Sequence, residues 1–126
     1  MVAVDTNVLV RFLTNDDKKQ AQSARKTIRD HQVWISKTVL LETEWVLRYS
    51  YDFPADQIEQ GFRALLGLVS VQVEDPTQVT TALDWYGKGL DFADALHVSA
   101  GRPRPFFTFD LKLIKKSKSL ANVRHP

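Results

Sequence analysis

The chain has no cysteine among its 126 residues, which excludes disulfides and thiolate metal sites. No apolar run is long enough to span a bilayer, and the first residues have the pattern of a β-strand rather than of a signal peptide. Repeats, linkers and low-complexity segments are absent as well. Since the length suits one domain with a substantial core, we expect a single cytoplasmic domain that comprises residues 1–126 and makes no contact with a membrane.

Acidic residues are scarce near the C-terminus. Residues 101–126 contain seven lysines and arginines but one acid, Asp110, whereas the rest of the chain has ten basic residues against fourteen acids, a net charge of −4. A basic end on a chain whose acids gather elsewhere indicates a polyanionic partner. A solvated, lysine-rich terminal helix explains the same pattern without a partner, so charge alone leaves both interpretations open.

Short apolar runs alternate with amphipathic segments along the whole chain. The expected strands are residues 2–4, 33–35, 69–73, 106–109 and, more weakly, 121–124. The segments between them have helical periodicity or helix-start signals such as Asp75-Pro76-Thr77-Gln78. This alternation predicts an α/β fold with a parallel sheet covered by helices on both faces. Right-handed crossovers then bring successive strand ends to the same edge of the sheet.

Two of the predicted strands end in an aspartate that precedes a helix, Asp5 and Asp110. Open α/β sheets bind their ligands at this edge, but either residue could instead cap the helix that follows. Two carboxylates facing each other there would repel unless a proton or a cation separated them.

Three further acids fall on predicted helices. Glu42 borders an apolar stripe, so it is either exposed at the margin of that stripe or held by a positive group, whereas Glu44 is expected at the surface. Asp91 and Asp94 project from one side of a first helical turn, where Asp91 is a natural N-cap and capping explains Asp94 less well. Carboxylates from several elements, without cysteine or a histidine pair, suit Mg²⁺ or Mn²⁺ better than zinc or copper. No histidine is an obvious general acid, and His97 is expected in the core.

Four motifs together resemble those of the PIN-domain ribonucleases. They are an apolar run before Asp5-Thr6-Asn7, Glu42 within residues 41–47, Asp94 within residues 91–96, and Thr108-Phe109-Asp110. Their order and spacing agree across essentially the whole chain, and the short length is similar to that of the toxins of VapBC-type toxin–antitoxin pairs. The resemblance implies a three-layer α/β/α fold around a central five-stranded parallel sheet, and an endoribonuclease that hydrolyses RNA phosphodiester bonds with metal-activated water.

The resemblance also implies roles for individual residues. The catalytic acids would be Asp5, Glu42, Asp94 and Asp110. The ligands of Mg²⁺ or Mn²⁺ would be Asp5, Asp94 and Asp110, with Asp91 either a further ligand or a cap. Asn7 and Thr108 would orient these acids through hydrogen bonds, and Phe109 stands where many relatives have a polar residue, which leaves the acids intact. Three lysines just after Asp110 are positioned to hold flanking phosphates, namely Lys112, Lys115 and Lys116.

The partners that the resemblance implies are an RNA substrate, a second copy of the chain in a homodimer, and a cognate small antitoxin protein. Contact with DNA would be only indirect, through the antitoxin. The aromatic residues that follow Glu42 agree with such interfaces because aromatic side chains are enriched there; they are Trp45, Tyr49, Tyr51 and Phe53.

Three other functions deserve comparison with this one. A haloacid-dehalogenase-type phosphatase also starts with a strand-end aspartate, but it needs a second acid two residues on, where this chain has Asn7. A phospho-acceptor signalling domain needs paired acids near the start and a strand-end lysine where this chain has Asp110. A non-catalytic RNA-binding or scaffold domain would keep the same fold, and the complete set of acids argues against it.

Overall fold

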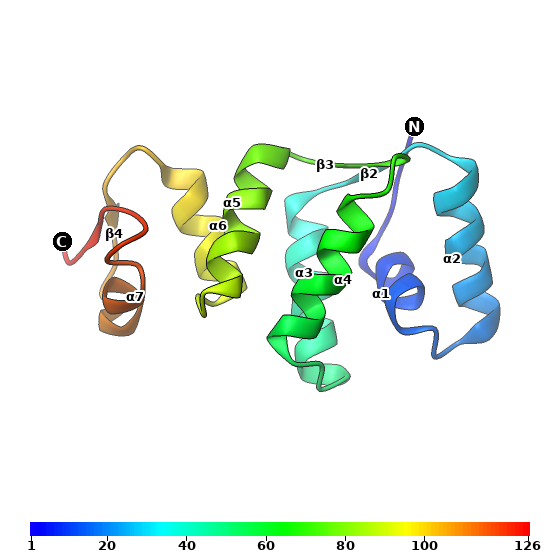
Figure 1. Cartoon of the computed structure of the whole chain (residues 1–126), viewed down its shortest axis with the longest axis horizontal. Coiled ribbons are helices and arrows are strands. Elements are labelled where there is room, and N and C mark those ends of the chain that lie inside the picture. Colours follow the sequence, from blue (N-terminus) through cyan, green and yellow to red (C-terminus); the bar gives the residue numbers. More distant parts are fainter. The chain divides into compact units, whose positions relative to one another are not determined.

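Seven helices and five short strands follow one another in the computed structural model, which describes residues 1–126 (Figure 1). They fall into two units, Met1–Pro76 and Thr77–Pro126. The first unit contains β1 (Val2–Ala3), α1 (Thr6–Thr14), α2 (Lys18–Asp30), β2 (Val33–Ile35), α3 (Lys37–Ser50), α4 (Ala55–Leu66) and β3 (Val71–Val73). The second contains α5 (Pro76–Gly87, starting at the last residue of the first unit), α6 (Phe92–Gly101), β4 (Phe106–Phe107), α7 (Leu111–Lys116) and β5 (Val123–Arg124).

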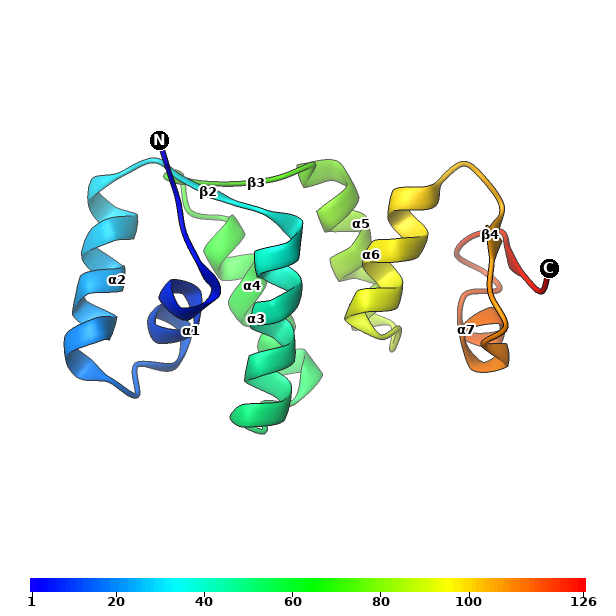
Figure 2. The ribbon, with the colours of Figure 1, turned by 180° about the vertical axis from the view of Figure 1, so that it is seen from behind.

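The strands of the first unit form a parallel sheet in the order β1-β2-β3. Val33 of β2 pairs with Val2 of β1 on one side and with Val71 of β3 on the other. Parallel strands need long crossover connections, which α1 and α2 supply between β1 and β2, and α3 and α4 between β2 and β3. Figures 1 and 2 show from opposite directions that α2 runs beside α1 and α4 beside α3.

One face of each helix in the first unit builds an apolar core. One stripe of α2 is buried, and the other helices contribute Leu9, Leu47 and Phe62. Complete burial of such a side chain stabilises the fold by ~1.5–3 kcal/mol, so these contacts fix the helices α1 and α3 that carry Asp5 and Glu42. No helix of the chain combines the length and the apolar character needed to cross a membrane.

The second unit places two helices before a two-stranded parallel sheet. Phe106 of β4 pairs with Val123 of β5, and α7 packs against β5. The rings of Tyr86 and Phe92 lie edge to face with their centroids 5.1 Å apart. Between α5 and α6 the chain turns at Gly89, whose φ of 101° is in the left-handed region that favours glycine.

Five helices begin at a side chain that accepts a hydrogen bond from a backbone N–H of the first turn. These residues are Asp5, Asp17, Ser36, Asp91 and Asp110. Each such cap stabilises its helix by ~1 kcal/mol. The capping interpretation of three candidate ligands is therefore confirmed, but a carboxylate has two oxygens and the cap occupies one of them.

Strands occur in all five predicted places, but they are shorter than predicted. The third begins at Val71 rather than Val69, whose side chain is almost fully exposed, and the fourth ends at Phe107. A sheet covered on both faces predicts buried strands, yet Ala3 is exposed and Val2 only half-buried, because β1 is an edge strand with a partner on one side. The strands form two sheets, of three and two strands, in place of the predicted central five-stranded sheet. The single domain with a layer of helices on each face stays a prediction.

Candidate functional site

The candidate acids of the first unit meet where α1 begins. Asp5 caps α1, and its Oδ1 accepts a hydrogen bond from the backbone nitrogen of Thr6 at 2.7 Å. The hydroxyl of Thr6 donates to Oε1 of Glu42, which lies on α3. Thr6 is buried, whereas both acids are exposed and line a cavity of about 440 Å³. Thr6 thus links the two carboxylates at the mouth of this cavity, through its backbone nitrogen to Asp5 and through its hydroxyl to Glu42.

Asn7 lines the same cavity but makes no hydrogen bond to Asp5 or Glu42. The orienting contact that the sequence assigned to Asn7 is made by its neighbour Thr6 instead. Thr6 is next to Asp5 on the turn into α1, so a threonine directly after a strand-end aspartate was the signal for this role.

The candidate acids of the second unit gather around Asp94. Oδ1 of Asp91 accepts a hydrogen bond from the backbone nitrogen of Asp94 at 3.1 Å, which caps α6. Burial raises the pKa of the Asp94 carboxyl, and the negative charges of Asp91 and Asp110 raise it further, while His97 and Lys116 act in the opposite direction. The carboxylate of Asp94 is therefore repelled by its two acidic neighbours, Asp91 and Asp110.

Asp110 is held at the turn from β4 into α7. Its Oδ1 accepts from the backbone nitrogen of Leu113 at 3.1 Å, and its own backbone nitrogen donates to the hydroxyl of Thr108 at 3.0 Å. Thr108 therefore contacts Asp110, as its predicted role requires, although through the backbone of Asp110. The lysines that follow on α7 are exposed, and Lys116 donates to the carbonyl oxygen of Gly89 at 3.3 Å.

Two residues lie where the sequence did not predict them. Glu44 is 1% exposed rather than at the surface, and its Oε2 pairs with Nε of Arg48 at 2.9 Å. It faces away from Glu42 because residues two apart on a helix point about 200° apart. His97 is exposed rather than in the core, and it lies one turn after Asp94, a spacing that places both on one side of α6.

The chemistry of these side chains fits a hard divalent cation. The candidate ligands are all carboxylates, and the repulsion around Asp94 is of the kind that a bound cation relieves. Within either unit, however, no three histidine, aspartate or glutamate side chains are close enough together to hold a metal ion. Neither unit by itself therefore presents a complete set of protein ligands.

Comparison with known proteins gives one result. A family model described as PIN domain matches residues 2–117 of the chain. A search of curated proteins found no match. PIN domains are generally metal-dependent nucleases, and they typically use divalent metal ions.

Proposed function

The chain belongs to the PIN domain family, and we propose that it is an endoribonuclease that hydrolyses RNA phosphodiester bonds with Mg²⁺ or Mn²⁺. The observation that carries this proposal is the position of the acids in the family's motifs. Asp5, Asp91 and Asp110 are held at the start of a helix, and Glu42 is held by the hydroxyl of Thr6. A cap occupies one oxygen of a carboxylate and leaves the other available to a cation.

The proposed ion would be held by the acids of the matched motifs, Asp5, Glu42, Asp94 and Asp110, with Asp91 serving mainly as the cap of α6. When bound, a divalent ion lowers the pKa of water and stabilises negative charge on phosphate. The side chains of the chain have separate tasks. The hydroxyl of Thr6 keeps Glu42 oriented, and Thr108 fixes the turn that presents Asp110. The exposed lysines of α7 would bind phosphates that flank the cleaved bond; they are Lys112, Lys115 and Lys116.

A biological role as the toxin of a VapBC-type pair is part of the proposal. Trp45 and Tyr49 follow Glu42 on α3 and are 55% and 59% exposed, with ring centroids 5.2 Å apart. The guanidinium of Arg48 lies 4.7 Å from the centroid of the Tyr49 ring. Two large exposed rings beside a candidate catalytic acid suit an interface, either with a second copy of the chain or with a small antitoxin.

The partner proposal has a direct test. Expressed together with the reading frames next to its own gene, the chain should co-purify with a small protein, and light scattering should show a dimer of the toxin. Trp45→Ala should weaken one of these associations. A monomer that co-purifies with no partner would contradict this part of the proposal and leave the nuclease part standing.

The alternatives are less well supported. A haloacid-dehalogenase-type phosphatase belongs to a different family from the one matched, and Asn7 still stands where its second acid is needed. A non-catalytic RNA-binding or scaffold PIN domain gives no reason for keeping carboxylates that repel one another around Asp94.

The nuclease proposal is tested with the full chain freed of any partner. The protein should cleave structured RNA with Mg²⁺ or Mn²⁺ and stop when EDTA is added. Asp5→Asn and Asp94→Asn should each reduce cleavage by more than the ~10–100-fold typical of losing an outer partner of a metal ligand. Asp56→Asn removes an exposed acid at the start of α4 and should have no effect, which makes it the matched control. Equal cleavage in EDTA, or full activity of either variant, would contradict the proposal.

A further inference from the structure

The cavity at Asp5 and Glu42 continues along α1 to a second group of polar residues. Its lining extends to Arg11 on α1 and to Ser50 and Tyr51 at the end of α3, all within the first unit. Six residues of helix separate Asp5 from Arg11, which corresponds to about 9 Å along the axis. The cavity therefore has two candidate metal ligands near one end and a cation near the other.

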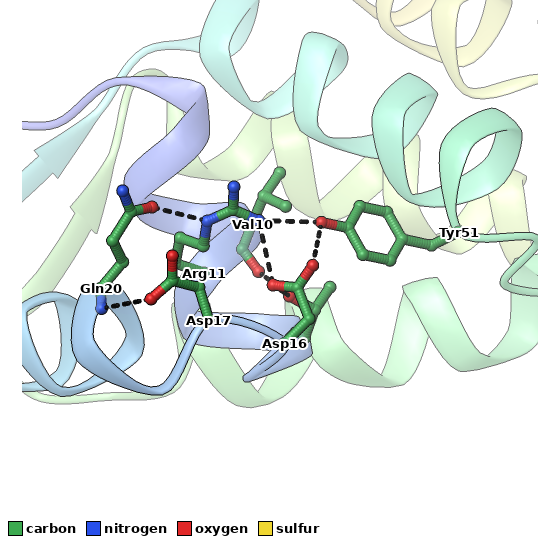
Figure 3. Close-up of polar contacts among 7 residues, drawn as sticks. Val10, Arg11, Asp16, Asp17, Gln20 and Tyr51 are labelled. Atoms are coloured by element: carbon green, nitrogen blue, oxygen red, sulfur yellow. Dashed lines mark hydrogen bonds and ion pairs between the residues drawn. The ribbon is translucent and has the colours of Figure 1, made fainter.

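The guanidinium of Arg11 is held in place from three directions (Figure 3). Its Nη1 donates to Oδ1 of Asp16 and to the hydroxyl of Tyr51, each at 2.9 Å. Its Nε donates to Oε1 of Gln20 at 2.7 Å, and Tyr51 in turn donates to Oδ2 of Asp16 at 2.7 Å. Hydrogen bonds from Tyr51, Thr14 and Arg11 lower the pKa of the Asp16 carboxyl, which keeps it ionised. The arginine is thus fixed by Asp16, which follows α1, by Gln20 of α2 and by Tyr51, the C-cap of α3.

These contacts do not use the whole guanidinium. The second terminal nitrogen, Nη2, donates no hydrogen bond within the protein. Arg11 and Asn7, one helical turn apart, also line a second cavity of about 210 Å³ beside α2. A planar guanidinium that is already oriented and retains free N–H groups is well suited to bind a phosphate.

We propose that Arg11, with Asn7 beside it, binds a phosphate of the RNA strand next to the one that is cleaved. The proposal rests on the nuclease function proposed above and assigns the direction of the strand along the site, from the acids at the start of α1 towards Arg11. An arginine that only braced α1 against α2 and α3 would need Asp16, Gln20 and Tyr51 but not the cavity that adjoins Glu42. Ser50 adds a hydroxyl to the lining of the same cavity, which gives the end near Arg11 a further hydrogen-bonding group.

The test measures binding of a single-stranded RNA oligonucleotide to the full chain carrying Asp94→Asn, which prevents cleavage. The dissociation constant is determined at several salt concentrations. Arg11→Gln should weaken binding at low salt by roughly 3–10-fold, and it should reduce the slope of log Kd against log salt by about 0.7, the value for one phosphate contact on a single strand. Arg29→Gln removes an arginine that is paired with Asp30 in a similar way, at 2.9 Å, but lies outside both cavities, and it should leave the slope unchanged.

A second variant keeps the test decisive if Arg11→Gln fails to fold. Asp16→Asn removes the negative charge that partly neutralises Arg11 and should tighten RNA binding. Asp30→Asn releases Arg29 from the equivalent pairing and corrects for the general effect of one added positive charge. Tighter binding by Asp16→Asn than by Asp30→Asn supports a phosphate at Arg11, because a brace would gain nothing from losing its partner.

Three outcomes would overturn the proposal. An unchanged salt slope in folded Arg11→Gln would make Arg11 a brace only, while RNA cleavage by the parent chain would leave the nuclease proposal intact. Loss of a co-purifying protein partner in Arg11→Gln, with RNA binding unchanged, would assign the arginine to an acidic group on that partner. No RNA binding by any form of the chain would reject this inference and the nuclease proposal together.

Discussion

The candidate acids of the two units are held in opposite ways. In the first unit, Asp5 and Glu42 accept hydrogen bonds from the backbone and the hydroxyl of Thr6, so each has a donor of its own. In the second, Asp94 is partly buried near two other carboxylates, whose charges add to burial in raising its pKa. The first arrangement stabilises the fold whether or not metal is present, whereas in the second Asp94 experiences a repulsion that a proton or a bound cation would relieve.

The largest expected effect concerns acids on one helix of the first unit. Glu44→Gln should destabilise the fold by about 3 kcal/mol, the lower end of the range for breaking a buried ion pair, because the Arg48 side chain is 30% exposed. Glu42→Gln, two residues away, keeps an acceptor for Thr6 and should unfold at nearly the same denaturant concentration as the wild type, yet lose cleavage. Urea unfolding and RNA cleavage of both variants check this. Loss of cleavage in Glu44→Gln at full stability would show that the roles of the two glutamates are reversed.

Local signals explain why much of this arrangement was predictable from the sequence. The helix starts at Asp5, Asp91 and Asp110 follow from the preference of aspartate for N-caps, and the buried stripe of α2 follows from its spacing. Strand positions were equally readable, because β-branched and aromatic runs between turn residues are local as well.

The parts that could not be predicted depend on tertiary packing. Helical periodicity separates the faces of Glu42 and Glu44 but does not say which face meets the core. Because burying a charge is usually costly, a surface position was predicted for Glu44, which is in fact buried. His97 was predicted to lie in the core but is exposed, because periodicity alone does not say which face of α6 packs inside. The contact between Arg11 and Tyr51 joins residues forty positions apart, and no local pattern predicts it.

The electrostatic repulsion on the Asp94 carboxylate gives the next prediction. Asp94→Asn should melt a few degrees higher than the wild type in EDTA near pH 7, because a repulsion screened by solvent amounts to less than ~1 kcal/mol. The raised pKa sets the sign of the pH dependence. Protonation of Asp94 favours the folded state, so its stabilising effect is complete below the unfolded pKa of ~3.9 and is lost as pH rises through the higher folded pKa.

The difference in melting temperature between Asp94→Asn and the wild type should therefore shrink as pH falls towards 4. It should also narrow or invert when Mn²⁺ is added, since metal stabilises only a protein that retains its ligands. Thermal melts at several pH values, with EDTA and with Mn²⁺, measure both trends. If Asp94→Asn is destabilised equally in both conditions, Asp94 has a structural role and does not belong to the site.

Asp91 should give the smallest effect because two contributions oppose each other. Removing the cap of α6 in Asp91→Ala costs ~1 kcal/mol, while removing its charge relieves part of the repulsion on Asp94. We expect a modest decrease in melting temperature in EDTA and a larger one in Mn²⁺ if Asp91 also assists the ion. The same decrease in both conditions would make Asp91 a cap alone.

The central claim is that the acids of the PIN motifs share one divalent ion, and a double-mutant cycle of Mn²⁺ binding tests it most directly. Calorimetric titration of the wild type, Asp5→Asn, Asp94→Asn and the double variant gives the four affinities. If the acids share one ion, each single change should weaken Mn²⁺ binding by at least ~10-fold, and the double variant should bind little worse than the weaker single variant. Unchanged Mn²⁺ affinity in Asp5→Asn, or fully additive losses in the double variant, would contradict the claim.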